Sequence, residues 1–358
     1  MTIDLTFIKQ YMWKQYILYR LILALAVVTL AGCVKDRANR PTSVNLSAAG
    51  TDTLRWSILP VQEVLPMPVD ISVTDSSVVV LGYCDSYWVH TFDKISGRRA
   101  SSFVLRGQGP EDVVNAVAMA AISDTSVSVY DTGTSRIHFV DLNSQSQQPP
   151  SRVSASDKTV WQAWGLSDST ALIKYPIHYT DNQPCRAFGT VNLTSGEQIA
   201  AYEELNAVFE DNPRLLIGQS VLALSPDKKH FVSATMIGGT LEFFEINDSL
   251  NIRSVESRLL FPAKISKEST KKPTYGFTAV CASNETIYTA FAGSENPDDA
   301  TKIAIWDWQG NLLNCVATDH LIISLAIDST TGTLYGVVIE EGVPVIAHIA
   351  IPEITSEN

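Results

Sequence analysis

The chain has 358 residues, of which 45% are hydrophobic and 18% are charged, and its formal net charge is −12. This composition is typical of a globular protein and excludes a disordered or collagen-like chain. Nucleic-acid binding requires a basic surface, so the acidic balance argues against a nucleic-acid partner. The length suggests two ordinary domains, although all-β architectures of this size often form one.

The first 32 residues have the order of a secretory signal peptide. Basic residues come first, and an apolar run over residues 21–30 follows them. This run is too short to cross a bilayer as a helix, which needs about 20 apolar residues. We therefore predict a signal peptide over residues 1–32, with Met1 and Met12 as alternative starts because Asp4 is unusual in a basic region.

The apolar run ends in the sequence Leu-Ala-Gly-Cys, with the cysteine at Cys33. This segment resembles the lipobox of bacterial lipoproteins, which are cut before the cysteine and acylated on its thiol. The resemblance implies a lipid (palmitate) anchor at Cys33 and a place in the outer membrane or elsewhere in the cell envelope. The periplasmic and surface sides both remain open. An uncleaved membrane anchor ending in a buried cysteine is the alternative.

Residues 33–52 are rich in Ser, Thr, Asn, Ala and Pro and are expected to form a flexible tether. The four later cysteines are far apart and show no CxxC spacing, so buried small side chains are favoured over metal ligands or disulfides. These cysteines are Cys84, Cys185, Cys281 and Cys315.

One pattern recurs six times after residue 53: an apolar alternating stretch, a turn containing Asp or Asn, and a second apolar stretch. The turns lie at 75–77, 124–126, 168–170, 226–229, 284–286 and 328–332. Their mean spacing is about 51 residues, which accommodates four short strands. Alternation with period two, without long helical periodicity, predicts an all-β six-bladed β-propeller with four-stranded blades over residues 53–358.

The sixth repeat shows only three evident strands and ends near residue 351. An apolar alternating stretch at residues 53–58 precedes the first repeat. We expect this N-terminal strand to be the outer strand of blade six and to close the ring, which leaves no exposed sheet edge.

The segment between the first two repeats reads Leu-Arg-Gly-Gln-Gly-Pro-Glu-Asp and ends at Asp112. It resembles the G-x-G-P-x-E segment of the TolB-like six-bladed β-propeller lipoproteins of Bacteroides-type bacteria. Gly107, Gly109 and Pro110 match, and Asp112 stands where that family has Glu. The resemblance implies a propeller at the cell envelope but no reaction, because that family is largely of unknown function.

Candidate binding residues lie in loops at the end of the propeller where inner strands begin, which we call the upper end. Ligands of propellers usually bind at such loops, near the central channel. The glycines would let backbone N–H groups approach an anion, while a rigid turn between blades is the simpler interpretation. The candidate residues are Arg106, Gln108, Glu111, Asp112 and Arg136.

The sequence contains no G-x-S-x-G or HExxH motif, and its six histidines are scattered. No catalytic residue, metal site or cofactor is therefore predicted. We expect a monomeric binding module for an envelope protein, peptide or glycan, attached to the membrane through its lipid. The alternative is a metal-dependent hydrolase of the lactonase or esterase type, with Glu111, Asp112 and Asn115 near the channel. Whether the protein is an enzyme stays open, with absence of activity favoured.

Overall fold

The computed structural model describes most of the chain after residue 40. The described residues are 41–44, 53–60, 65, 68–154, 159–176, 178–180, 183–205, 219–261, 273–296 and 298–351. The predicted signal peptide, Cys33 and most of the predicted tether lie outside them. The chain divides into the units Met1–Pro41 and Thr42–Asn358, and the second contains the sheets. In the described part of the chain, no helix has the length and apolarity needed to cross a membrane.

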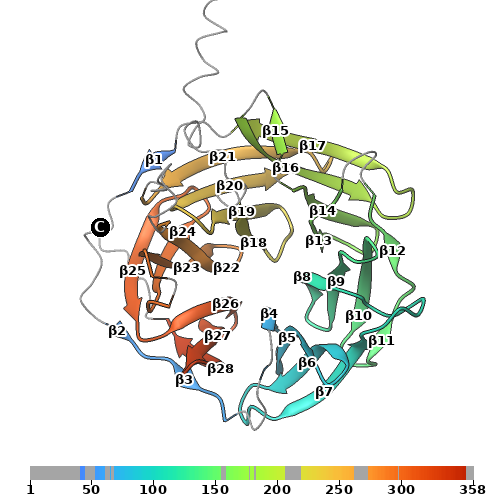
Figure 1. Ribbon diagram of the computed structural model, residues 1–358, viewed down its shortest axis with the longest axis horizontal. Helices are drawn as coiled ribbons and strands as arrows, with labels where there is room; N and C mark the ends of the chain where they lie inside the picture. The colour runs from blue at the N-terminus through green and yellow to red at the C-terminus, as the bar shows by residue number, and fades with distance from the viewer. Residues whose placement is uncertain are drawn as a thin grey trace, which may run out of the picture. The chain divides into compact units, whose positions relative to one another are not determined.

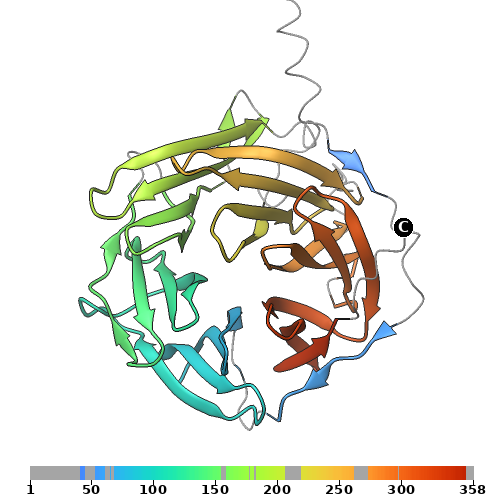
Figure 2. The ribbon, with the colours of Figure 1, turned by 180° about the vertical axis from the view of Figure 1, so that it is seen from behind.

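Six small sheets form a ring, which confirms the six-bladed β-propeller (Figures 1 and 2). The main strands of each blade are antiparallel neighbours that follow one another outward from the channel in chain order, except that β3 (Ser57–Ile58) is the outer strand of blade six and the short β15 (His178–Thr180) pairs with β16 (Gln183–Asn192). Blade one contains β4 (Pro68–Val73), β5 (Ser77–Cys84), β6 (Tyr87–Asp93) and β7 (Arg99–Leu105). Blade two contains β8 (Ala116–Ser123), β9 (Ser126–Asp131), β10 (Arg136–Asp141) and the short outer strands β11 (Ser146–Gln147) and β12 (Ser151–Arg152).

The other four blades repeat this plan. Blade three contains β13 (Gln162–Gly165), β14 (Thr170–Lys174), β15 (His178–Thr180), β16 (Gln183–Asn192) and β17 (Gln198–Leu205). Blade four contains β18 (Ser220–Leu224), β19 (His230–Thr235), β20 (Thr240–Ile246) and β21 (Ile252–Leu259). Blade five contains β22 (Tyr275–Ala282), β23 (Thr286–Ser294), β24 (Lys302–Asp307) and β25 (Leu312–Thr318). Blade six contains β26 (Leu321–Asp328), β27 (Thr333–Glu340), β28 (Val343–Ala350) and β3 (Ser57–Ile58).

The core lies between the blades, because each sheet packs a face against each neighbour. The second strands are accordingly buried on both faces, as in β5, where Val78, Val79, Val80 and Leu81 are all nearly inaccessible. Phe231 and Phe244 of blade four stack with ring centroids 4.5 Å apart, and Phe188 of blade three packs edge-on against both, at 5.1 and 5.2 Å. This two-sided burial explains why the second stretch of each repeat reads as a continuous apolar run.

The polar turns of the sequence close hairpins at the lower end, opposite the starts of the inner strands. In the turn between β6 and β7, Asp93 Oδ1 accepts hydrogen bonds from the N–H groups of Ile95 and Ser96 at 3.2 and 2.7 Å. The bonds from the Ser96 N–H and hydroxyl lower the pKa of Asp93. Gly97 follows with a φ of +67°, a conformation that favours glycine. The turn residues therefore act locally, as predicted.

The N-terminal segment closes the ring, but it divides its pairing among three blades. Ser57–Ile58 pairs with β28 and is the outer strand of blade six, as expected. β2 (Thr53–Leu54), from the same predicted strand, instead runs parallel to β25 of blade five. β1 (Thr42–Ser43), within the predicted tether, pairs with β21 of blade four.

The division follows the packing of Trp56. Trp56 is buried in the hydrophobic cluster shared by blades five and six, with Leu54 packed against it. The N–H of Trp56 also donates to Asp319 Oδ1 at 3.2 Å, beyond the end of β25. Because this residue is buried between the two blades, the chain before it lies along blade five and the chain after it along blade six.

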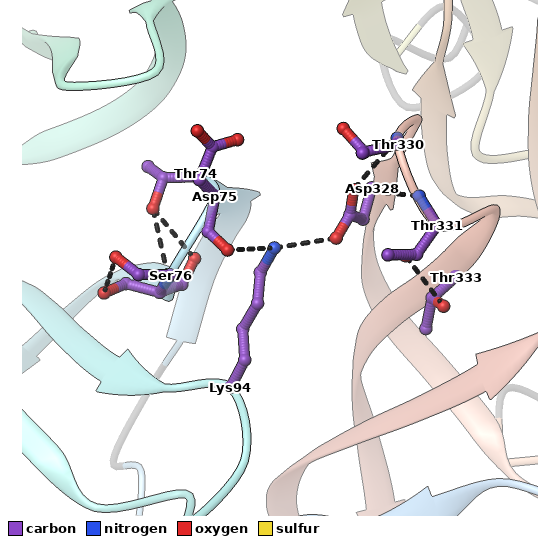
Figure 3. A network of polar contacts seen from close by, with 9 residues as sticks. Thr74, Asp75, Ser76, Lys94, Asp328, Thr330, Thr331 and Thr333 are labelled. Carbon is purple, nitrogen blue, oxygen red and sulfur yellow. Dashed lines mark hydrogen bonds and ion pairs between the residues drawn. The ribbon is translucent and has the colours of Figure 1, made fainter.

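A polar contact joins blades one and six at the lower end (Figure 3). Lys94 Nζ donates to Asp328 Oδ2 at 2.7 Å and to the carbonyl oxygen of Asp75 at 3.2 Å. The Lys94 and Asp328 side chains are each only 11% exposed. Burial opposes ionisation of Asp328, but the bond and charge of Lys94 outweigh it and lower the pKa of this carboxyl. The pair therefore ties the first blade of the ring to the last.

Candidate ligand-binding site

Two cavities of about 360 Å³ each lie along the channel, one at the upper end and one at the lower end. Residues of the inner strands line both cavities. Neighbouring upper loops complete the upper cavity, and the lower hairpins complete the lower one. Four residues line both cavities and therefore lie where these meet: Asp70, Trp164, Leu222 and Val280. A volume of this size falls in the range of small-molecule sites.

The rim of the upper cavity is apolar and exposed. Trp161, immediately before β13, is 51% exposed, while Val69 and Met236 are 41% and 40% exposed. All three line the cavity. Large hydrophobic side chains with this exposure at a concave opening are the usual chemistry of a binding surface.

Asp70 lies deeper, on β4. Its Oδ1 accepts hydrogen bonds from the N–H of Ile71 at 2.8 Å and from the hydroxyl of Ser324 at 3.2 Å. Burial raises the pKa of Asp70 to about 6, against the opposing effect of these bonds and of a bond from the Met119 backbone. A carboxyl with a raised pKa in a cavity is a functional candidate.

Lys174, on β14, is the amine of the upper cavity. Its Nζ donates to the carbonyl oxygen of Ser220 at 2.6 Å and to Gln162 Oε1 at 3.4 Å. Hydroxyl and amide groups of Gln219, Ser220 and Thr278 also lie in the lining. The cavity thus combines an apolar rim with hydrogen-bonding groups inside, which suits orientation of a bound group.

The lower cavity is enclosed by the first hairpins of the blades. Lys228, in the turn of blade four, reaches the carbonyl oxygen of Ala121 in blade two with a separation of 2.5 Å. Burial lowers the pKa of Lys228 to about 8, partly offset by the nearby charge of Asp227. The amine therefore holds two non-adjacent blades together across this end of the channel.

The structure places the predicted binding residues outside both cavities, on the loop between blades one and two and at the start of β10. Arg106, Gln108 and Glu111 are exposed, and the Arg106 guanidinium lies 4.4 Å from the centre of the Tyr83 ring. Arg136 Nη1 donates to the carbonyl oxygen of Pro110 at 3.3 Å. Their role in binding stays a prediction, and none of them contacts Asp70 or Trp161 among the described contacts.

Asp112 explains the glycines of the same loop. Its Oδ2 accepts the N–H of Gly109 at 2.8 Å. A Cβ atom on Gly107 would lie only 2.1 Å from that oxygen, and one on Gly109 would lie 2.8 Å from it. Glycine is therefore needed at both positions so that the carboxylate of Asp112 can fold back against the loop. This arrangement agrees with the simpler interpretation of the segment as a rigid turn between blades.

Asp131, at the end of β9, supports this loop and was not among the residues predicted from the sequence. Its two oxygens accept the N–H groups of Val114, Asn115 and Gly133 and the hydroxyl of Thr134, at 2.7 to 3.0 Å. The side chain is fully buried. It fixes the chain where blade two begins.

The described residues contain no group of three His, Cys, Asp or Glu side chains placed to hold a metal ion. Glu111 and Asn115 are both exposed, so no observation here favours the predicted alternative of a metal-dependent hydrolase. Cys84, Cys281 and Cys315 are free thiols. The side chain of Cys185 lies outside the described residues, as do parts of the upper loops at 176–184, 203–219 and 264–276.

Three residues that line the upper cavity were not predicted from the sequence: Asp70, Trp161 and Lys174. A signal was present for the first two, since Asp70 interrupts the apolar first strand of blade one and Trp161 directly precedes the inner strand of blade three. Residues at the start of an inner strand face the channel mouth in this fold. Nothing in the sequence indicates that Lys174 lines the cavity, because Lys174 ends the second strand of its blade rather than beginning the inner one. It lines the cavity only because of how the blades pack.

The profile of the family described as TolB-like 6-blade propeller-like matches residues 56–330. The chain belongs to this family. Among solved structures, a Bacteroides fragilis protein named as exported has a TM-score of 0.53 at 11% identity, covering 86% of this chain and 98% of that one. A member of the DUF4221 family from Bacteroides vulgatus has a TM-score of 0.54 at 10% identity, covering 84% and 96%. These identities show the fold alone.

No curated protein matches the chain by sequence. The TolB-like propeller fold supports a protein-interaction module in general, because a rigid ring presents variable loops at its ends. The fold does not identify the partner, since one scaffold hosts many functions.

Proposed function

We propose that this TolB-like propeller is a lipid-anchored binding protein of the bacterial cell envelope, without a nucleic-acid partner and monomeric. Its upper cavity binds part of an envelope protein, peptide or glycan. The observation that carries the proposal is the cavity itself, which combines exposed Trp161, Val69 and Met236 at the rim with polar groups inside.

The envelope location is supported by the lipobox-like sequence that ends at Cys33 and by the similar Bacteroides fragilis protein named as exported. The substitution Cys33→Ser tests the anchor. We expect wild-type protein to incorporate an alkyne-tagged fatty acid in cells and to sediment with membranes, and the variant to do neither. Sedimentation of the variant with membranes without label would favour an uncleaved anchor instead.

The binding site is tested by affinity capture from solubilised envelopes with wild-type protein and three variants. Trp161→Ala removes the rim aromatic, and Ile199→Ala removes an apolar side chain of 41% exposure on β17 of the same blade, outside both cavities. We expect partners to be lost with Trp161→Ala and retained with Ile199→Ala.

The third variant carries Arg106→Ala and Glu111→Ala together and tests the predicted loop. Loss of partners with this variant but not with Trp161→Ala would place binding on the loop between blades one and two. Retention with all three variants would contradict both sites.

A further inference from the structure

Asp70 is the only carboxylate among the described residues that line the upper cavity. It lies where the upper and lower cavities meet, and the other residues that line both cavities are the apolar Trp164, Leu222 and Val280. Its partners are hydrogen-bond donors without charge: the N–H of Ile71, the hydroxyl of Ser324 and the backbone of Met119. The described structure therefore gives this carboxylate hydrogen bonds but no cation.

The amine of the same cavity does not supply that cation. Lys174 Nζ donates to the carbonyl oxygen of Ser220 at 2.6 Å and to Gln162 Oε1, groups on blades three and four. Asp70 belongs to blade one. Asp70 is only partly exposed, and a carboxylate that loses contact with water without gaining an opposite charge is costly to ionise. This desolvation raises the pKa of Asp70 to about 6.

A bound cation would relieve this cost, whereas a neutral ligand would leave it in place. Aromatic rings on the cavity wall add to the attraction, because the face of an indole attracts ammonium and guanidinium groups. Trp161 and Trp164 both line the upper cavity. The net charge of −12 also favours approach of a basic partner over an acidic one.

The rim indicates how the cation is presented. Val69, Trp161 and Met236 are exposed around the opening and suit apolar side chains on either side of a charged one. A free inorganic ion would leave these side chains exposed. A chain with an apolar–basic–apolar order would cover them while its basic group enters the cavity.

We propose that the upper cavity recognises a basic side chain, Lys or Arg, of a peptide segment, which enters to ion-pair with Asp70 while neighbouring apolar residues cover Trp161, Val69 and Met236. This inference rests on the proposed function, because it assigns a ligand chemistry to the same cavity.

The test measures binding of two acetylated and amidated peptides, Gly-Leu-Arg-Leu-Gly and the same sequence with citrulline in place of arginine. Citrulline keeps the shape of the side chain and removes its charge. By calorimetry and by the fluorescence of the tryptophans, with peptide up to millimolar concentration, we expect the arginine peptide to bind about tenfold or more tightly than the citrulline peptide. Asp70→Asn should abolish that difference.

The control variant is Asp75→Asn, which removes the same charge from an exposed carboxylate in the lower hairpin that follows β4. We expect it to bind both peptides as the wild type does. Equal affinity for the two peptides, no binding of the arginine peptide, or equal weakening by both substitutions would overturn the proposal. The melting temperature of each variant confirms folding.

Failure of this inference and failure of the proposed function give different results. If the arginine peptide does not bind but capture of an envelope partner still requires Trp161, the site stands and the basic ligand is wrong. Binding of a neutral oligosaccharide that requires Trp161 but not Asp70 would likewise replace the peptide with a glycan. If capture is unaffected by Trp161→Ala, the site itself is wrong.

Discussion

The same six inner strands line both ends of the channel, yet the side chains around the two ends make different kinds of contact. At the lower end, lysines from hairpin turns reach other blades: Lys94 of blade one contacts Asp328 of blade six, and Lys228 of blade four contacts the carbonyl oxygen of Ala121 in blade two. At the upper end, Trp161 and Met236 remain exposed around a cavity.

The difference follows from the connections at each end. Hairpins at the lower end are short, so their side chains lie close to neighbouring blades and are used in structural contacts. Connections at the upper end leave large apolar side chains at the channel mouth without a covering group in the described residues. Structural contacts occur at the upper end as well, where Lys174 of blade three donates to the carbonyl oxygen of Ser220 in blade four. We infer that the lower hairpins mainly join blades to one another, whereas the exposed apolar mouth of the upper cavity is a candidate binding surface.

The largest effect on stability is expected for Asp131→Ala, which tests whether part of the upper end is also structural. This substitution leaves the N–H groups of Val114, Asn115 and Gly133 without their buried acceptor. We expect the free energy of unfolding to fall by about 3 kcal/mol, measured by urea denaturation. The control is Asp124→Ala in the exposed lower turn of the same blade, where no loss is expected. Equal losses of unfolding free energy in Asp131→Ala and Asp124→Ala would show that the hydrogen bonds of Asp131 do not stabilise the start of blade two.

A smaller effect is expected for Lys94→Met, which breaks the contact between the first and last blades (Figure 3). Asp328 would keep a largely buried charge without its cation, so we expect a loss of about 2 kcal/mol in the free energy of unfolding. Lys229→Met is the control, because the Lys229 side chain is 62% exposed and its Nζ lies 3.9 Å from Oδ1 of the exposed Asp248. A surface pair of this kind contributes about 0–1 kcal/mol. Similar losses in both variants would contradict a structural lower end.

Lys228→Met tests the contact between Lys228 and the carbonyl oxygen of Ala121 through the pH dependence of stability. The folded state lowers the pKa of Lys228 from 10.5 to about 8, so between these values the unfolded chain binds more protons than the folded one. Wild-type stability should therefore increase from pH 8 to pH 10 relative to the variant, by about 1 kcal/mol after allowance for solvent at the amine. Melting curves of both proteins across this range provide the measurement. Parallel pH profiles would show that the amine is not buried in solution.

The smallest effect on stability is expected for Trp161→Ala at the upper rim. Half of this side chain is already exposed, so the free energy of unfolding should change by no more than about 1 kcal/mol while binding is lost. Denaturation of the variant beside Ile199→Ala measures this. A loss comparable to that of Asp131→Ala would mean that Trp161 supports the fold and would weaken its assignment as a binding residue.

Much of the fold followed from local patterns. The Asp- and Asn-containing turns, such as the one at Asp93, recur because their side chains bond to nearby N–H groups, which depends only on neighbouring residues. The closing strand of blade six was predicted correctly at Ser57–Ile58 and wrongly at Thr53–Leu54, which pairs with blade five. Its division depends on the burial of Trp56 between blades five and six, a contact between residues far apart in the sequence.

The site was harder to predict than the fold. The loop from Arg106 to Asp112 was predicted to bind a ligand partly because of its glycines. In the structure, the Asp112 carboxylate lies so close to Gly107 and Gly109 that a side chain at either position would collide with it. Asp70 and Trp161 come from different blades and share no motif. Their proximity to one cavity depends on the closure of the whole ring.

The sequence by itself determined the all-β class, the six repeats and the turn chemistry, because these depend on alternation and on contacts between near neighbours. Only the tertiary structure decided which side chains line the channel, that Lys94 and Lys228 join separate blades, and that Asp70 lies between the two cavities without a cation in the described structure. The physical reason is that each of these depends on residues brought together by the ring, at separations that no local pattern records.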